Sequence, residues 1–274
     1  MIGRASTRIG AIAAATCVAA TASAQSGAIF HMSGPATEGR SGMWGDAILE
    51  SVEFPGGETF SDFVTARAVT DFQCASSYRG LGWSVSTGTE CTTGDPGWFK
   101  VQAEDGDSSD ITDEDRELFN QRVTEVLNDR NLNSLVHLKS ANASFIIEFN
   151  ETIHDDDPEF DNFGEILYFE RGTNAGNSTA YIQAVDEDGN ALGPLVMIDG
   201  DETLPTTPIV TIGTPWATHL TNQTMGGATV DLTRLGVESI RYLRVTNGTS
   251  DPDFKIFAVW TRPRVLPQRP NPFD

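Results

Sequence analysis

The fold is decided by the sequence DNFGEILYFERG at residues 161–172 and by AYIQAVDEDGN at residues 180–190. Apolar and polar residues alternate in both segments, and an Asp-Gly pair lies near the end of the second. Alternation with a period of two indicates half-buried strands, and Asp-Gly supplies the positive φ that tight hairpins need. The same pattern returns at residues 239–247 and 254–261. The sequence therefore predicts a mainly β protein built as an antiparallel, jelly-roll-like β-sandwich.

One packed helix is expected near residues 112–128. Thr112 is a suitable N-cap, and the three acidic residues after it occupy the first turn, where the helix dipole favours negative charge. Five apolar residues then recur near helical spacing between Leu118 and Leu127. We expect this apolar stripe to pack against a sheet. Farther along, Asp231 is predicted to cap a single helical turn that Gly236 ends.

The N-terminus carries the features of an export signal. Arg4 and Arg8 precede an apolar stretch at residues 9–20, and the sequence ASA at residues 22–24 fits the small-x-small cleavage rule. Residues 1–24 are therefore predicted to be a signal peptide that is cleaved near Ala24. Residues 25–261 are expected to form a single β-sandwich domain, and the proline-containing tail at residues 262–274 is expected to be disordered.

Composition narrows the possible partners. The chain holds 18 basic and 39 acidic residues, a formal net charge of −21. A surface this negative repels nucleic acid, so a nucleic-acid partner is excluded. No segment after the signal reaches 18 consecutive apolar residues, so the mature chain should lack a membrane span. The expected location is secreted, extracellular or on the cell surface.

The cysteines agree with export. Cys17 would leave with the signal peptide, and Cys74 and Cys91 would remain as a pair in an oxidising compartment. We predict a disulfide between them, with two free thiols as the alternative.

The acidic loops suggest calcium. Asp155, Asp157, Glu159 and Asp161 lie within seven residues after a predicted strand, and calcium prefers such carboxylate oxygens. The alternative is a solvated turn. The segment at residues 186–190 also has carboxylates at alternate positions, but there a plain hairpin turn is favoured.

Two pairs of residues are candidates for ligand binding. Trp83 and Trp216 lie in loops that contain Gly or Pro, where a flat ring could stack on a sugar. Glu170 and Arg171 are adjacent on a strand, so their side chains point to opposite faces. Each of these two charged residues is either paired within the structure or contacts a ligand.

Catalytic motifs are absent from the sequence. The four histidines lack the spacing of metal ligands, and neither a phosphate-binding loop nor a nucleophile elbow occurs. A carboxylate pair for glycoside hydrolysis could be drawn from Glu148, Glu165 and Glu170, but sequence does not give their separation. The sequence therefore leans against an enzyme without deciding the question.

The second half of the chain resembles a known family. Its motifs run in the order NLN at 131–133, FIIEFN at 145–150, DNFGEILYFERG at 161–172, IQAVDEDGN at 182–190, DLTRLGV at 231–237 and PDFKIFAV at 252–259. They resemble the exosortase-dependent surface proteins over residues 131–260, with features that recur in galactose-binding-like domains. This resemblance implies an exported bacterial protein that is displayed at the cell surface or shed into the matrix. The family usually ends in a Pro-Glu-Pro motif, a membrane span and a basic tail. This sequence stops at PNPFD, which favours free secretion or another attachment.

The expected function is a structural, matrix or adhesive role without catalysis. The alternative is a jelly-roll carbohydrate-binding module, with structural calcium as its possible cofactor. The partner in either case would be an extracellular polysaccharide or a cell-surface matrix.

Overall fold

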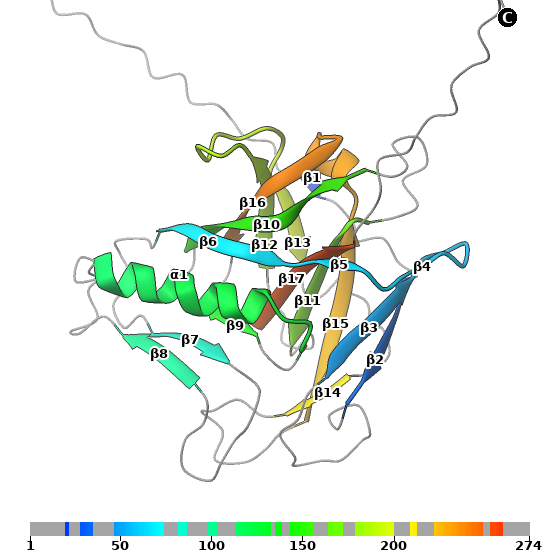
Figure 1. Cartoon of the computed structure of the whole chain (residues 1–274), viewed down its shortest axis with the longest axis horizontal. Helices are drawn as coiled ribbons and strands as arrows, with labels where there is room; N and C mark the ends of the chain where they lie inside the picture. Colours follow the sequence, from blue (N-terminus) through cyan, green and yellow to red (C-terminus); the bar gives the residue numbers. More distant parts are fainter. Residues whose placement is uncertain are drawn as a thin grey trace, which may run out of the picture.

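The computed structural model describes residues 20–21, 28–34, 47–73, 82–86, 98–102, 113–132, 135–138, 143–155, 164–171, 179–199, 209–212, 222–248 and 253–259. Strands dominate these ranges and form three sheets, so the protein is mainly β (Figure 1). The predicted antiparallel β-sandwich with one packed helix is confirmed.

The first sheet has six strands in the order β1-β13-β12-β16-β10-β6. Their bounds are β1 Ala20–Thr21, β13 Val196–Asp199, β12 Thr179–Val185, β16 Ser239–Asn247, β10 Ser144–His154 and β6 Ala66–Gln73. All neighbours are antiparallel except β1, which runs parallel to β13.

The second sheet has the order β14-β15-β11-β17-β9-β7-β8, and β5 also pairs with β17. Its strands are β14 Ile209–Ile212, β15 Asn222–Val230, β11 Ile166–Arg171, β17 Asp253–Val259, β9 Val136–Leu138, β7 Gly82–Ser86, β8 Trp98–Gln102 and β5 Phe63–Val64. A third, three-stranded sheet contains β2 Ile29–Ser33, β3 Ile48–Glu53 and β4 Thr59–Phe60.

In its second half the chain crosses several times between the two large sheets, although β13 follows β12 within the six-stranded sheet and β15 follows β14 within the second. β10, β12 and β16 belong to the six-stranded sheet, whereas β11, β15 and β17 belong to the second sheet. A chain that crosses repeatedly from one sheet to the other joins them as the two layers of a β-sandwich.

The second sheet lies between two apolar cores because its central strands are buried on both faces. Ile166 and Tyr168 of β11 pack into the larger core, together with residues of the six-stranded sheet and of the helix. Leu167 and Phe169 point to the opposite face and pack with the three-stranded sheet. Side chains alternate in direction along a strand, so an uninterrupted apolar run is what a strand covered on both sides requires.

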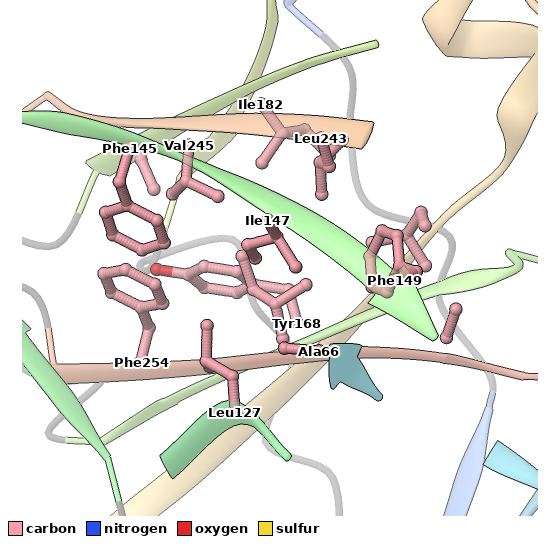
Figure 2. Packing of buried hydrophobic residues seen from close by; sticks show 14 of the residues in the cluster. Ala66, Leu127, Phe145, Ile147, Phe149, Tyr168, Ile182, Leu243, Val245 and Phe254 are labelled. Carbon is pink, nitrogen blue, oxygen red and sulfur yellow. The ribbon is translucent and has the colours of Figure 1, made fainter. Parts of the chain in front are cut away.

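Aromatic stacking fills the larger core (Figure 2). The ring of Phe254 on β17 stacks on Phe145 with centroids 6.2 Å apart and on Tyr168 at 5.8 Å. These three rings come from β17, β10 and β11, so they join the two large sheets across the sandwich. Aromatic pairs of this kind contribute about 0.5–1.5 kcal/mol beyond the area they bury.

The helix α1, Asp113–Leu127, confirms the helix predicted for residues 112–128. Phe119 stacks on Phe72 of β6 at 3.8 Å, and the hydroxyl of Thr124 accepts the N–H of Val69 at 2.8 Å. The helix therefore covers β6 through its predicted apolar stripe. Leu118, at one edge of that stripe, is half-buried rather than buried.

Two predicted turns are also confirmed. Asp231 caps the 3₁₀ turn η4, Leu232–Leu235, and Gly236 ends it in the left-handed conformation at φ 71°. In the hairpin after β12, Gly189 has φ 78°. The Asp186 carboxylate accepts backbone N–H groups from Asp188 and Asn190.

Apolar and polar residues also alternate at residues 63–70, which predicts one regular strand there, and this prediction is wrong. The structure divides this segment into β5 and β6, and it buries Ala66 and Val69, which the expected alternation assigns to opposite faces. The physical reason is that the pairing of β6 with β10 contains two register shifts. Such bulges insert an extra residue and interrupt the period of two.

The contact between the three-stranded sheet and β11 gives the first prediction. Phe30 of β2 packs edge-on against Phe169 at 4.9 Å, and its ring lies where a side chain at Gly227 would stand. We expect Phe30→Ala to lower the free energy of unfolding by about 3–5 kcal/mol, because it leaves a cavity between the sheets. Chemical denaturation measures this change.

Ile29→Ala is the matched control, since Ile29 is the exposed neighbour of Phe30 on the same strand. Its effect should stay within about 0.5 kcal/mol. Equal effects of the two substitutions would contradict the packing of the three-stranded sheet on β11.

Candidate functional site

A surface pocket of about 560 Å³ opens between β5, the end of α1 and the middle of β10. It is called the surface pocket below. Its lining comes from three segments that lie far apart in the sequence: Ser61, Asp62, Phe63, Val64 and Thr65; Asn128, Asp129 and Arg130; and Asn150 and Glu151. The volume falls within the range of small-ligand sites.

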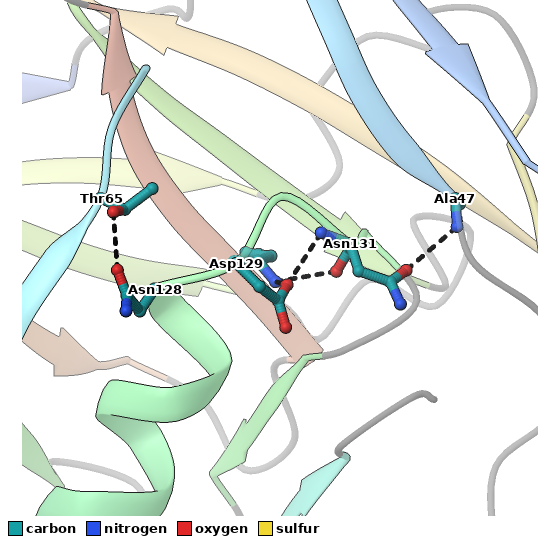
Figure 3. A network of polar contacts seen from close by, with 6 residues as sticks. Ala47, Thr65, Asn128, Asp129 and Asn131 are labelled. Atoms are coloured by element: carbon teal, nitrogen blue, oxygen red, sulfur yellow. Dashed lines mark hydrogen bonds and ion pairs between the residues drawn. The ribbon is translucent and has the colours of Figure 1, made fainter. Parts of the chain in front are cut away.

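Hydrogen bonds fix the loop that follows α1 (Figure 3). The Thr65 hydroxyl donates to Asn128 Oδ1 at 2.9 Å, and the Asn131 N–H donates to Asp129 Oδ1 at 2.8 Å. Asn131 Oδ1 in turn accepts the N–H of Ala47 at 3.0 Å. Asn128 and Asp129 are therefore held in place from both sides while they line the pocket.

A buried cation lies beneath this loop. Lys255 of β17 is fully buried, and its ammonium group donates to Asp129 Oδ1 and to the Asn131 carbonyl oxygen at 2.8 Å. Desolvation lowers the pKa of Lys255 to about 8, and the charge of Asp129 opposes that shift. The lysine is thus still mainly protonated at pH 7, and the Asp129 side chain remains 43% exposed on its pocket side.

The pocket has one aromatic wall. Phe63 is half-buried between the core ring of Phe257, with centroids 6.2 Å apart, and the guanidinium of Arg130, 5.8 Å from its centroid. Phe63 therefore has a fixed position, and the remaining lining consists mainly of amide, hydroxyl and carboxylate groups. This combination suits a polar ligand that also has an apolar edge.

A second polar cluster lies at the start of β11. Glu165 is only 1% exposed, and its Oε2 accepts the N–H of Leu232 at 3.0 Å. Burial, assisted by the nearby carboxylates of Asp231 and Asp155, raises the pKa of Glu165 to about 8, and hydrogen bonds from backbone N–H groups partly oppose this shift. Glu165 is therefore protonated and uncharged at neutral pH. Its burial needs no cation nearby to balance a negative charge.

Of the predicted ligand residues, Glu170 has a described side chain, and it does not line the surface pocket. Glu170 is fully buried in the larger core region and accepts the Tyr168 hydroxyl at 2.8 Å, so it serves as a structural partner. Arg171 ends β11, and Trp83 lies on the strand β7 rather than in the expected loop. The side chains of both residues are outside the described residues. Trp216 lies entirely outside them.

The predicted calcium ligands are only partly described. Asp155 follows β10 and its N–H donates to the Glu238 carbonyl oxygen at 2.9 Å, whereas Asp157, Glu159 and Asp161 lie outside the described residues. Within the described ranges, no group of three or more His, Cys, Asp or Glu side chains is placed to hold a metal ion. The calcium hypothesis therefore stays a prediction.

The segment at 186–190 forms the favoured hairpin turn. Asn190 donates through its N–H to Asp186 Oδ1 at 2.7 Å and through its amide to Oδ2 at 3.0 Å. These hydrogen bonds lower the pKa of Asp186, led by the bond from the Asn190 side chain. Both carboxylate oxygens of Asp186 are thus used within the turn.

Cys74 and Cys91 lie outside the described residues, so their disulfide stays a prediction.

The three carboxylates considered for glycoside hydrolysis do not share a face. Glu148 lies on β10 of the six-stranded sheet, where it pairs with Arg67 and Arg241. Glu165 directly precedes β11 and Glu170 lies within it five positions farther on, so the alternation of the strand directs their side chains to opposite faces. Their arrangement therefore differs from the facing pair that such catalysis needs.

Sequence reasoning missed the surface pocket, Lys255 and the burial of Glu165. The sequence did contain a signal for the two charged residues, Lys255 and Glu165. The alternation of β17 places Lys255 on the face of Phe257, and that of β11 places Glu165 on the face of Leu167. A charge on an apolar face indicates a buried, paired group.

No protein-family model matches the sequence, and no curated protein or solved structure is detectably similar to it. In the described part of the chain, no helix is both long and apolar enough to cross a membrane.

The buried Glu165 predicts a pH dependence of stability. Its pKa rises from 4.5 to about 8 on folding, so the folded protein binds more protons than the unfolded chain in this interval. The contribution to stability is complete below pH 4.5 and is lost as the pH rises towards about 8. Glu165→Gln should remove this part of the slope, at most about 1.4 kcal/mol per pH unit.

Denaturant unfolding at several pH values measures the effect. Glu187→Gln, which removes an exposed carboxylate in the hairpin turn, is the control for the loss of one negative charge. An unchanged slope in Glu165→Gln would show that Glu165 is ionised in the folded protein.

Proposed function

We propose that this protein is an exported, non-catalytic protein of the cell surface or extracellular matrix with a structural or adhesive role. The predicted signal peptide and the acidic composition support export and solubility. The resemblance of residues 131–260 to the exosortase-dependent surface proteins supports a place at the cell surface or in the matrix. In this proposal, the β-sandwich is the scaffold and adhesion depends on binding rather than on turnover.

The surface pocket favours carbohydrate binding as the means of adhesion. Amide, hydroxyl and carboxylate groups from Asn128, Asn150, Thr65 and Asp62 surround the half-buried ring of Phe63. A sugar presents many hydroxyl groups together with apolar C–H edges, so it matches a wall of this composition. The pocket is the observation that carries the proposal, whereas Trp83 and Trp216 remain predicted platforms.

The rigidity of the lining supports binding over catalysis. Thr65 and Asn128 are joined by a hydrogen bond, and Asp129 is held by Lys255 and Asn131. A preformed site loses little conformational entropy when it binds a ligand, which favours affinity.

Binding of the mature protein to immobilised polysaccharides tests the proposal. The panel should include neutral, amino and acidic glycans, with soluble protein measured by depletion. Asn150→Ala removes an exposed amide from the pocket and should weaken binding about tenfold, the loss of one to two hydrogen bonds.

Gln121→Ala is the matched control, because it removes an exposed amide from the solvent side of α1. Equal binding by the two variants would move the site elsewhere. Absence of binding to every glycan would contradict the adhesive role through carbohydrate, and release of reducing ends would contradict a non-catalytic protein.

A further inference from the structure

The surface pocket has more negative than positive charge. Lys255, which is buried beneath the loop, balances the charge of Asp129. The other charged lining residues are two carboxylates, Asp62 and Glu151, and one guanidinium, Arg130. Arg130 lies over Phe63, and neither Asp62 nor Glu151 forms an ion pair with another described residue. One added positive charge would therefore balance the lining.

The end of α1 adds to this negative potential. The helix ends at Leu127, directly before the lining residues Asn128 and Asp129, and its last turn contains no basic residue. The C-terminal end of a helix carries partial negative charge, so it stabilises a nearby cation. A fifteen-residue helix thus points its negative end at the side of the pocket where the loop begins.

The neutral groups of the lining suit hydroxyl groups. Asn128 Oδ1 is occupied by the Thr65 hydroxyl, so its amide nitrogen, on the side away from Thr65 in Figure 3, is the group available to donate. Asn150 contributes a second exposed amide, and Phe63 supplies the apolar wall. Because Asn150 Nδ2 already donates to the Thr65 hydroxyl at 3.4 Å, its amide oxygen is the group that can accept from a ligand. A polyhydroxyl ring can use this oxygen and the Asn128 amide nitrogen, whereas a simple alkyl ammonium could not accept from the Asn128 nitrogen.

We propose that the surface pocket binds an amino sugar: a pyranose whose hydroxyl groups bond with Asn128 and Asn150 and whose protonated amine pairs with Asp62 and Glu151. This inference rests on the proposed carbohydrate binding and specifies its ligand class. The net charge of −21 would also attract a polycationic glycan and repel an acidic one.

The experiment compares two oligomers of equal length, one of β-1,4-linked glucosamine and the other its fully N-acetylated counterpart. Calorimetric titration of the mature protein at about pH 5.5 keeps the amines of the glucosamine oligomer protonated. The glucosamine oligomer should bind roughly tenfold more tightly, because two exposed charge pairs are added. Raising the salt concentration should reduce this preference.

Glu151→Gln and Asp62→Asn should each reduce the preference to about threefold or less, while circular dichroism confirms that they remain folded. Glu187→Gln, the same change of charge outside the pocket, should retain the full preference. Retention of the preference in both pocket variants would assign it to the overall acidic surface and overturn the proposed pairing.

The remaining outcomes separate this inference from the proposed function. Equal affinity for both oligomers, lost in Asn150→Ala, would overturn the amino-sugar preference and leave carbohydrate binding at the pocket intact. If the protein binds neither oligomer but still binds a neutral polysaccharide, the amino-sugar preference is likewise overturned and carbohydrate binding remains. Binding of no glycan at all would overturn both.

Discussion

The Lys255 ammonium lies inside the protein, where it meets the Asp129 carboxylate and the Asn131 carbonyl oxygen. Burying a charge costs several kcal/mol unless a partner and hydrogen bonds compensate for it. The loop after α1 must therefore pass directly over β17, and its position is dictated by the need of this one cation. Asn131 extends the constraint to the segment before β3 by accepting the N–H of Ala47. One buried charge thus connects β17, the helix end and the beginning of the three-stranded sheet.

The surface pocket is a consequence of this arrangement. Its lining joins β5, the loop after α1 and β10, and these segments meet because β5 pairs with β17, which carries Lys255. The pairing of Asp129 with Lys255 also offsets a negative charge that would otherwise be unfavourable at the C-terminal end of α1. What remains open to a ligand is the less compensated part of the lining, Asp62 and Glu151, together with exposed amides. In the proposed function, structural and binding roles are therefore divided among neighbouring carboxylates.

Local sequence patterns predicted the helix and many of the strands well. They did not predict which residues of distant segments come into contact. β16 begins and ends at the residues that alternation indicated, and Asp231 and Gly236 bound η4 as their capping chemistry requires. These features depend only on neighbouring residues. The surface pocket joins segments separated by dozens of residues, so no local spacing could reveal it. At β6 the predicted alternation of buried and exposed residues failed, because the pairing with β10 contains bulges that shift the register. The charges of Lys255 and Glu165 on apolar faces were visible, but their partners came from tertiary structure.

The most direct test of this account is the pKa of Lys255, measured by NMR titration of lysine side-chain carbons. The chain contains only three lysines, so the Lys255 resonance can be assigned by its absence from Lys255→Met. The account predicts a midpoint at about 8 in the folded protein, and a further decrease in Asp129→Asn because the opposing charge is removed. A midpoint at the ordinary value of 10.5, unaffected by Asp129→Asn, would show that Lys255 is solvated and that it does not organise the pocket.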